Sequence, residues 1–192
     1  MNLSVKKTIL FSLVLFTSFS LKAQFDDRMI TANDDTIACK LSRSMMGAFK
    51  YKTAKGDKGE VDKGEVKEFY TGDKKKWVRR VYITSQRYPC YMTVLERGKI
   101  SLYEMDAGFV YYNGNSFYNN GPKTQWFVAK GTDTAELVKD GDNTLFNGRK
   151  ERKTYFMQLI EDNKTAYDQY MADDKFSYEE IKRIVELYNS AR

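Results

Sequence analysis

The stretch YMTVLERGKISLYEM, residues 91–105, carries a clear signal for two antiparallel strands. Apolar and polar residues alternate on both sides of Arg97 and Gly98, as they do in strands with one buried face. A two-residue turn at that point gives three cross-strand pairs: Glu96 with Lys99, Leu95 with Ile100, and Met92 with Tyr103. The first pair joins opposite charges and the others join apolar side chains, so the stretch predicts a β-hairpin.

Other segments on both sides of this hairpin have the strand period or a strand-forming composition. They are residues 35–41, 49–53, 65–71 and 76–84 before it, and residues 126–130 and 135–138 after it. An aromatic content of 15% and only two prolines also favour a sheet-rich body. We therefore expect an antiparallel sheet of about seven strands, open or curled into a partial barrel, over about residues 35–139.

The hydrophobic period changes to that of helices after Gly148. The last helix has the clearest start: Ser177 is an N-cap residue, Glu180 follows three residues later, and Phe176 is placed to form a hydrophobic staple with Ile181. One apolar stripe follows, formed by Ile181, Ile184, Val185 and Tyr188. Two or three helices over about residues 148–190 therefore complete an α+β fold.

The N-terminus has the pattern of an export signal. Lys6 and Lys7 precede an apolar run, residues 9–19, and small residues follow up to Ala23. The run has about half of the roughly 20 residues that a membrane-spanning helix needs. We expect a signal peptide at residues 1–23, with cleavage after Ser20 as the alternative. The mature chain, residues 24–192, then forms a single domain without a transmembrane segment, in the periplasm or secreted.

The charge balance argues against nucleic acid as a partner. The whole chain has a net charge of +6, but three of its lysines lie in residues 1–23, so the mature chain has +3 with interspersed signs. The basic run GDKKKWVRRVYI, residues 72–83, is interpreted as a strand that leaves a turn, with alternate cations facing water; contact with anionic envelope material is the alternative. We therefore predict no nucleic-acid partner.

The sequence shows no constellation for common catalytic chemistry. Histidine is absent, which excludes Ser-His-Asp and Cys-His arrangements, and there is no glycine-rich phosphate loop. We predict no catalytic residue, no metal site and no cofactor. A pair of carboxylates acting on a glycosidic bond is the remaining enzymatic alternative, with Glu68 and Glu104 as the residues to test.

The loop YYNGNSFYNNGP, residues 111–122, is the candidate binding surface. Aromatic side chains beside Asn and Gly combine rigid contact area with adaptable hydrogen bonding, as in many recognition loops. The candidate residues are Tyr111, Tyr112, Phe117 and Tyr118. An ordinary long connection that packs back on the sheet is the alternative.

The two cysteines, Cys39 and Cys90, both lie in strand patterns. An exported chain with an even cysteine count can form one disulfide between them. Two buried free thiols are the alternative, because free cysteine is among the most buried residue types.

A tandem repeat, DKGEVDKGEV, occupies residues 57–66. Its period is odd, so within one strand Val61 and Val66 would face opposite sides of the sheet. We therefore predict that only Val66 has a core position, and that residues 55–64 form a solvated turn between two strands.

Several of these stretches together resemble an uncharacterised family of exported proteins from Gram-negative bacteria. The matching residues are the export signal, Asp35-Thr36-Ile37, Val66-Lys67-Glu68-Phe69, the hairpin from Val94 to Tyr103, and Tyr188-Asn189. The resemblance implies an envelope or secreted location and no catalytic residue. It includes neither the repeat nor the cysteines. We expect a non-enzymatic binding or scaffolding protein of the cell envelope, with an envelope protein or a glycan as its partner; the alternative is a small carboxylate-dependent glycan hydrolase.

Overall fold

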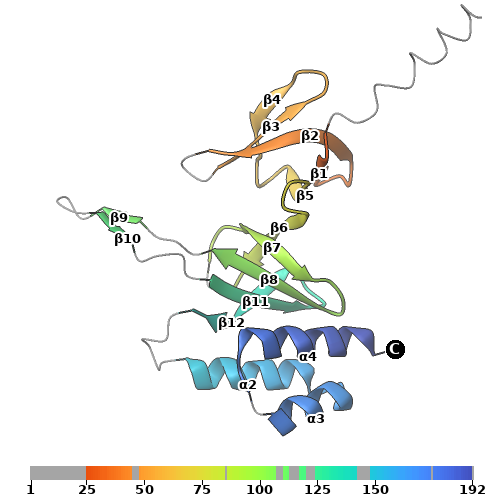
Figure 1. Cartoon of the computed structure of the whole chain (residues 1–192), viewed down its shortest axis with the longest axis vertical. Coiled ribbons are helices and arrows are strands. Elements are labelled where there is room, and N and C mark those ends of the chain that lie inside the picture. The colour runs from red at the N-terminus through yellow and green to blue at the C-terminus, as the bar shows by residue number, and fades with distance from the viewer. Residues whose placement is uncertain are drawn as a thin grey trace, which may run out of the picture.

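The computed structural model describes residues 25–44, 48–84, 86–106, 110–112, 117–119, 124–141, 148–173 and 175–191. A large sheet leads into three C-terminal helices, so the predicted α+β class is confirmed (Figure 1). The helices are α2 (Arg149–Ile160), α3 (Lys164–Asp173) and α4 (Tyr178–Ser190). The predicted signal peptide, residues 1–23, lies outside the described residues.

The sheet is larger than the sequence indicated. Its strands are β1 (Asp27–Thr31), β2 (Thr36–Arg43), β3 (Phe49–Thr53), β4 (Lys58–Glu60), β5 (Val66–Thr71), β6 (Lys76–Ile83), β7 (Cys90–Glu96), β8 (Ile100–Asp106), β11 (Thr124–Lys130) and β12 (Thr134–Asp140). They follow the order β12-β11-β8-β7-β6-β5-β1-β2-β3-β4. The prediction of about seven antiparallel strands is therefore wrong: the main sheet has ten strands and is mixed, because β12 and β6 pair in parallel.

Strand β1 was missed because a charged residue occupies one of its core positions. Asp27 is almost fully buried, and its carboxylate accepts hydrogen bonds from the backbone N–H of Leu41 at 2.7 Å and of Gly72 at 2.8 Å. These bonds connect β1 to β2 and to the hairpin between β5 and β6. A carboxylate inside a strand breaks the apolar alternation, so the sequence pattern did not show β1.

Strand β6 connects two parts of the sheet. On one edge it pairs with β7; on the other edge its first half pairs with β5, and its last two residues, Tyr82 and Ile83, pair with β12. The sheet therefore forms a closed ring of five strands: β6, β7, β8, β11 and β12. The remaining strands continue from β6 as an open sheet in the order β5-β1-β2-β3-β4. Figure 1 shows β1 to β5 at one end of the molecule and the helices at the other.

The closed strands separate two cores. Residues facing into the ring form one core, with Met92, Tyr103 and Phe127 among its members. Residues on the outer face of β8, β11 and β12, such as Leu102 and Val128, pack against the helices. Consecutive residues of β11, Trp126 to Ala129, are therefore all buried, because both faces of the strand are covered. A third core lies under β1 to β5.

The predicted hairpin at residues 91–105 is present as β7 and β8, but its register differs from the predicted one. Val94, not Met92, lies opposite Tyr103, and a bulge at Leu95 places Glu96 opposite Leu102. The turn is longer than the predicted two residues, because a residue of α4 binds beside it. The Asn189 side chain accepts a hydrogen bond from the Ile100 N–H at 2.9 Å and donates one to the Ile100 carbonyl at 2.8 Å. Glu96 pairs with Lys182 of α4 rather than with its hairpin neighbour.

Helix α4 begins as predicted. Ser177 accepts a hydrogen bond from the Glu180 N–H at 3.1 Å, and Phe176 and Ile181 are buried in the same core. The stripe from Ile181 to Tyr188 is buried against the sheet and the other helices. The side chain of Glu180 does not close the capping box but binds Arg183, at 2.6 and 3.0 Å.

The repeat is not a simple loop. Lys58, Gly59 and Glu60 of its first copy form β4, the outermost strand of the open sheet, and residues 62–65 of the second copy form a turn. Val61 and Val66 are both buried, 6% and 5% exposed, in the same core. The prediction that only Val66 has a core position is wrong, because a turn lies between the two valines and they do not share a strand.

This arrangement predicts that the two valines contribute equally to stability. Val61→Ala and Val66→Ala should each lower the free energy of unfolding by about 1 to 3 kcal/mol, since each removes buried apolar surface. Urea unfolding followed by circular dichroism measures both changes. Lys63→Ala, an exposed position within the turn, is the control and should have no effect. A silent Val61→Ala beside a destabilising Val66→Ala would contradict the observed role of β4.

Candidate functional site

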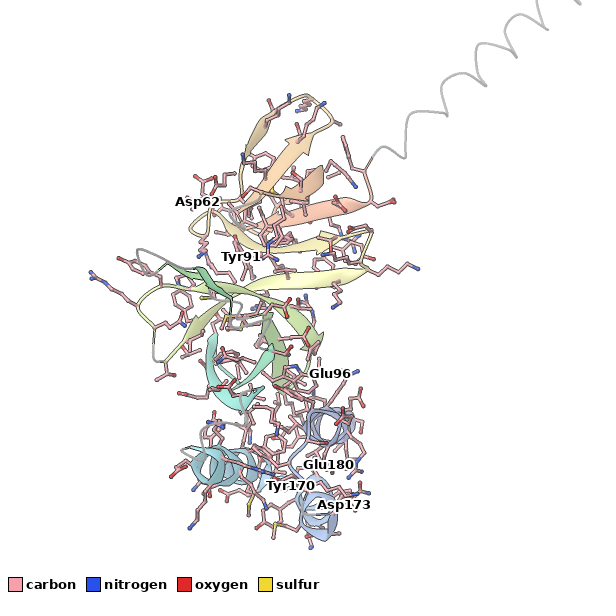
Figure 2. All side chains as sticks on the ribbon, turned by 60° about the vertical axis from the view of Figure 1, so that its left-hand side comes forward. Asp62, Tyr91, Glu96, Tyr170, Asp173 and Glu180 are labelled. Carbon is pink, nitrogen blue, oxygen red and sulfur yellow. The ribbon has the colours of Figure 1, made fainter. Side chains whose placement is uncertain are left out.

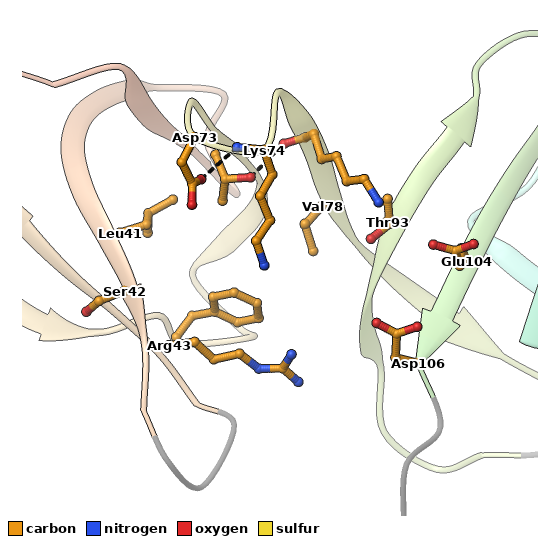
Figure 3. A pocket seen from close by; sticks show the side chains of 12 residues that line it. Leu41, Ser42, Arg43, Asp73, Lys74, Val78, Thr93, Glu104 and Asp106 are labelled. Carbon is orange, nitrogen blue, oxygen red and sulfur yellow. Dashed lines mark hydrogen bonds between the residues drawn. The ribbon is translucent and has the colours of Figure 1, made fainter. Parts of the chain in front are cut away.

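A hollow lies where the open sheet meets the closed strands (Figure 3). One wall comes from β2 and β3, the second from the hairpin between β5 and β6, and the third from β7 and β8. The lining residues are Leu41, Ser42, Arg43, Phe49, Thr71, Asp73, Lys74, Lys76, Val78, Thr93, Glu104 and Asp106. Its volume is about 190 Å³, smaller than the several hundred Å³ typical of sites for drug-sized ligands. The hollow therefore suits one side chain or one sugar ring.

The hollow carries charges of both signs, and Asp73 lies beside Lys74 on the same hairpin. Arg43 and Lys74 reach into it from β2 and from the β5–β6 hairpin, whereas Glu104 and Asp106 lie on the opposite wall, on β8 (Figure 3). Glu104 and Asp106 are two residues apart in one strand, so they share a face of the sheet. The Glu104 carboxylate also accepts a hydrogen bond from Trp126 Nε1 at 3.1 Å. A ligand that carries both positive and negative groups would match this lining.

Aromatic rings support the hollow from beneath. Phe49 lies 4.6 Å from Phe69 and 6.3 Å from Tyr91, measured between ring centroids, and the Arg43 guanidinium lies 5.5 Å from the centre of the Phe49 ring. Tyr91 donates to the carbonyls of Val66 and Asp62, which join β7 to the turn of the repeat (Figure 2). Burial raises the pKa of Tyr91 to about 12. Tyr91 therefore stays a neutral donor and fixes the angle between the two parts of the sheet.

A second hollow, of about 440 Å³, continues from the first. Arg43 and Phe49 line both, and the second extends along Tyr91, Met105 and Lys63. We call the two hollows together the groove. It is lined by both apolar and charged side chains from several strands, which is the kind of lining that can hold an extended chain.

The buried carboxylates are structural. Asp27 holds backbone N–H groups of two strands, as described above. Glu68 binds Arg97 at 3.0 Å and lies 4.0 Å from Arg79, and Glu180 binds Arg183. Among the described residues, no two buried carboxylates face each other inside the groove. Glu68 is therefore an unsuitable catalytic residue, because two arginines hold its carboxylate and it does not line the groove.

One pair of carboxylates does interact, but outside the groove. Glu96 on β7 and Glu186 on α4 both contact Lys182, at 3.5 and 3.4 Å. Burial and the neighbouring Glu186 raise the pKa of Glu96. The shared lysine accounts for their proximity, because it bridges the sheet to α4.

The predicted binding loop forms a small hairpin. Strands β9 (Val110–Tyr112) and β10 (Phe117–Asn119) pair so that Tyr112 lies opposite Phe117 and Tyr111 opposite Tyr118. This hairpin is separate from the ten-stranded sheet (Figure 1). The side chains of these four residues lie outside the described part of the chain, so their role in binding stays a prediction.

Cys39 and Cys90 are free thiols in the structure. Cys39 is fully buried in the core under β1 to β5, whereas Cys90 is half-buried beside the core of the closed strands, where its thiol lies 3.1 Å from the side-chain Oε1 of Gln86. Burial raises the pKa of Cys39 to about 11, and the nearby Asp27 adds to the rise. The two sulfur atoms therefore have different neighbours and different exposure to solvent.

Comparison with protein-family models, with curated proteins and with solved structures finds no match to this chain. Within the described ranges, no group of three or more Cys, Asp or Glu side chains is arranged to hold a metal ion. None of the described helices is long and apolar enough to cross a membrane.

Sequence reasoning named Glu104 but missed the groove. Arg43, Phe49 and Asp106 come from strands that are distant in sequence, and no local motif connects them. A local signal was present in β3, where Phe49 and Tyr51 alternate with lysines, but not in β2, which supplies Arg43. Their convergence depends on the bend of the sheet at β6.

Different reactivities of the two thiols follow from their surroundings. The thiolate is the reactive form, so at pH 8 iodoacetamide should modify Cys90 at least roughly tenfold faster than Cys39 in the folded protein. Peptide mass spectrometry measures both rates, and Cys39 should react fully once urea unfolds the chain. Cys90→Ser is the control and should leave the folded protein unmodified. If neither cysteine reacts in unfolded chains until a reductant is added, the thiols are joined by a disulfide.

Proposed function

We propose that this chain is an exported binding protein of the cell envelope, and that its groove holds an extended segment of another envelope protein. The observation that carries this proposal is the mixed lining of the groove. Cations such as Arg43 and carboxylates such as Asp106 lie beside the apolar ring of Phe49. An extended peptide offers charged side chains of both signs, as well as apolar ones, along a chain of the right shape.

The surroundings of the groove favour binding over catalysis. Binding requires a surface that is already in place, and the rings of Phe49, Phe69 and Tyr91 pack together under the groove. Rigid aromatic residues lower the entropy cost of association, because little order has to be gained on binding. Charges at the rim would select the partner and orient it.

Site-specific photo-crosslinking tests this function. A photoreactive phenylalanine analogue replaces Thr71 or Thr93, both in the groove, or Met171, an exposed residue of α3 that serves as the control. Irradiated cells should give one shared crosslinked partner from the two groove positions and none from position 171. Lys74→Glu or Asp106→Lys should then reduce the yield about tenfold, because each change puts a repulsive charge opposite the ligand.

Equal crosslinking from all three positions would contradict the proposal, as would a yield that is insensitive to both charge reversals. Tyr88→Ala provides a further matched control. Tyr88 is 68% exposed and does not line the groove, so its removal should leave the crosslink unchanged.

The glycan hydrolase is the second candidate, because two carboxylates, Glu104 and Asp106, line the same hollow. Glycosidic hydrolysis needs one acid and one base or nucleophile. If this function is correct, the wild-type protein should release reducing ends from purified peptidoglycan, and Glu104→Gln or Asp106→Asn should each abolish the release. Retained activity in both variants, or no activity of the wild type, would exclude it.

A further inference from the structure

Three lysines lie directly opposite one another across the open end of the sheet. Lys40 on β2 pairs with Lys52 on β3, and Lys52 pairs with Lys58 on β4. Because cross-strand neighbours share a face, the three ammonium groups form one row, with neighbouring strands about 4.8 Å apart. All three side chains are exposed. We call this row the lysine ladder.

Little negative charge compensates the ladder. A broad hollow of about 750 Å³ lies over it, lined by these three residues and by Lys50, and Glu60 is the only carboxylate in that lining. Lys40 lies 3.6 Å from Asp27, but that carboxylate already accepts two backbone N–H groups. In the part of the chain that the structure describes, the side chains of Lys50, Lys52 and Lys58 form no hydrogen bond or ion pair.

Such a row lowers the stability of the folded protein. Like charges directly opposite each other in neighbouring strands are destabilising, and here one residue, Lys52, has a like charge on both sides. A single acidic residue at position 52 would remove the repulsion. A ligand with closely spaced negative charges would remove it as well, so the ladder gains most from binding an anionic partner.

The position and chemistry of the ladder favour a planar, fluid partner. Strands β3 and β4 form the tip of the molecule, at the end opposite the helices (Figure 1). The cations that line the hollow are all lysines, whose flexible point charges need no fixed bidentate partner, unlike arginine. The half-buried Phe25 lines the same hollow and adds an aromatic ring beside the cations.

From these observations we propose that the lysine ladder docks the protein onto anionic lipid headgroups. Each lysine near an anionic membrane surface contributes about 1 kcal/mol, roughly a fivefold change in partition. Three lysines in one row then suffice for reversible attachment, with the molecule standing on its tip. The three lysines of the ladder do not line the groove, so this inference does not depend on the function proposed for the groove.

Vesicle sedimentation tests the docking with the chain from Gln24 onward, because the apolar residues 9–19 would themselves insert into a bilayer. The vesicles contain phosphatidylcholine with or without 30% phosphatidylglycerol. Binding should require the anionic lipid and should weaken as salt is raised. The triple variant Lys40→Ser, Lys52→Ser, Lys58→Ser should lose about a hundredfold in partition, since three lysines are removed. The matched control replaces Lys150, Lys164 and Lys175, exposed residues at the helical end, with serine, and should lose much less.

Lys52→Glu separates the docking role from an effect on folding. The change places opposite charges next to each other across three strands, so the melting temperature should rise while vesicle binding falls at least tenfold. Three results would overturn the proposal: equal losses in the two triple variants, binding that is independent of salt, or ladder-dependent binding to a soluble acidic polysaccharide with none to vesicles.

Discussion

The fold depends on one shared edge of strand β6. The first half of that edge pairs with β5 and its end pairs with β12, while β7 occupies the other edge. Two sheets that share an eight-residue strand cannot rotate freely against each other, because a rotation would break the backbone hydrogen bonds of one or the other. The groove between β2–β3 and β7–β8 is therefore a consequence of backbone pairing. Tyr91 reinforces the angle by bonding to carbonyls near the start of β5.

Closure at β6 also determines where the stability of the protein lies. Strands β8 and β11 are covered on both faces, by the ring interior and by the helices, and α4 docks on them with its whole apolar stripe. Lys130 extends this attachment: it binds Asp162 at 2.8 Å and lies over the ring of Tyr188, which in turn donates to Asp162. The open end has a smaller core, under β1 to β5, and none of the described helices packs on it. The closed, helix-covered end is therefore the more stable part of the molecule.

Local signals in the sequence were enough for most elements, but not for the way they combine. The hairpin at residues 91–105 and the cap at Ser177 depend on neighbouring residues, so alternation and capping rules found them. The hairpin register depends on Asn189, about 90 residues away, and β1 depends on a buried Asp27, so local rules failed for both. The groove residues Arg43 and Asp106 carry no signal of their own. The parity argument about Val61 and Val66 failed because it assumed that no turn lay between them.

Because the closed end is the more stable part of the molecule, the open end can carry residues that bind a ligand but destabilise the fold. Destabilising features are tolerated where they do not disrupt the main core, and natural proteins commonly give up some stability for function. The row of Lys40, Lys52 and Lys58 is such a feature, and it lies on the strands farthest from the helices. The repeat supplies β4, so the first DKGEV copy contributes both Val61 to the core and Lys58 to the ladder. Without β4, Lys52 would have one like-charged neighbour instead of two, and the row would be too short to act as a docking surface. The five-residue repeat thus connects a stabilising valine to a destabilising lysine in one segment, which explains how this edge can carry the charge and still fold.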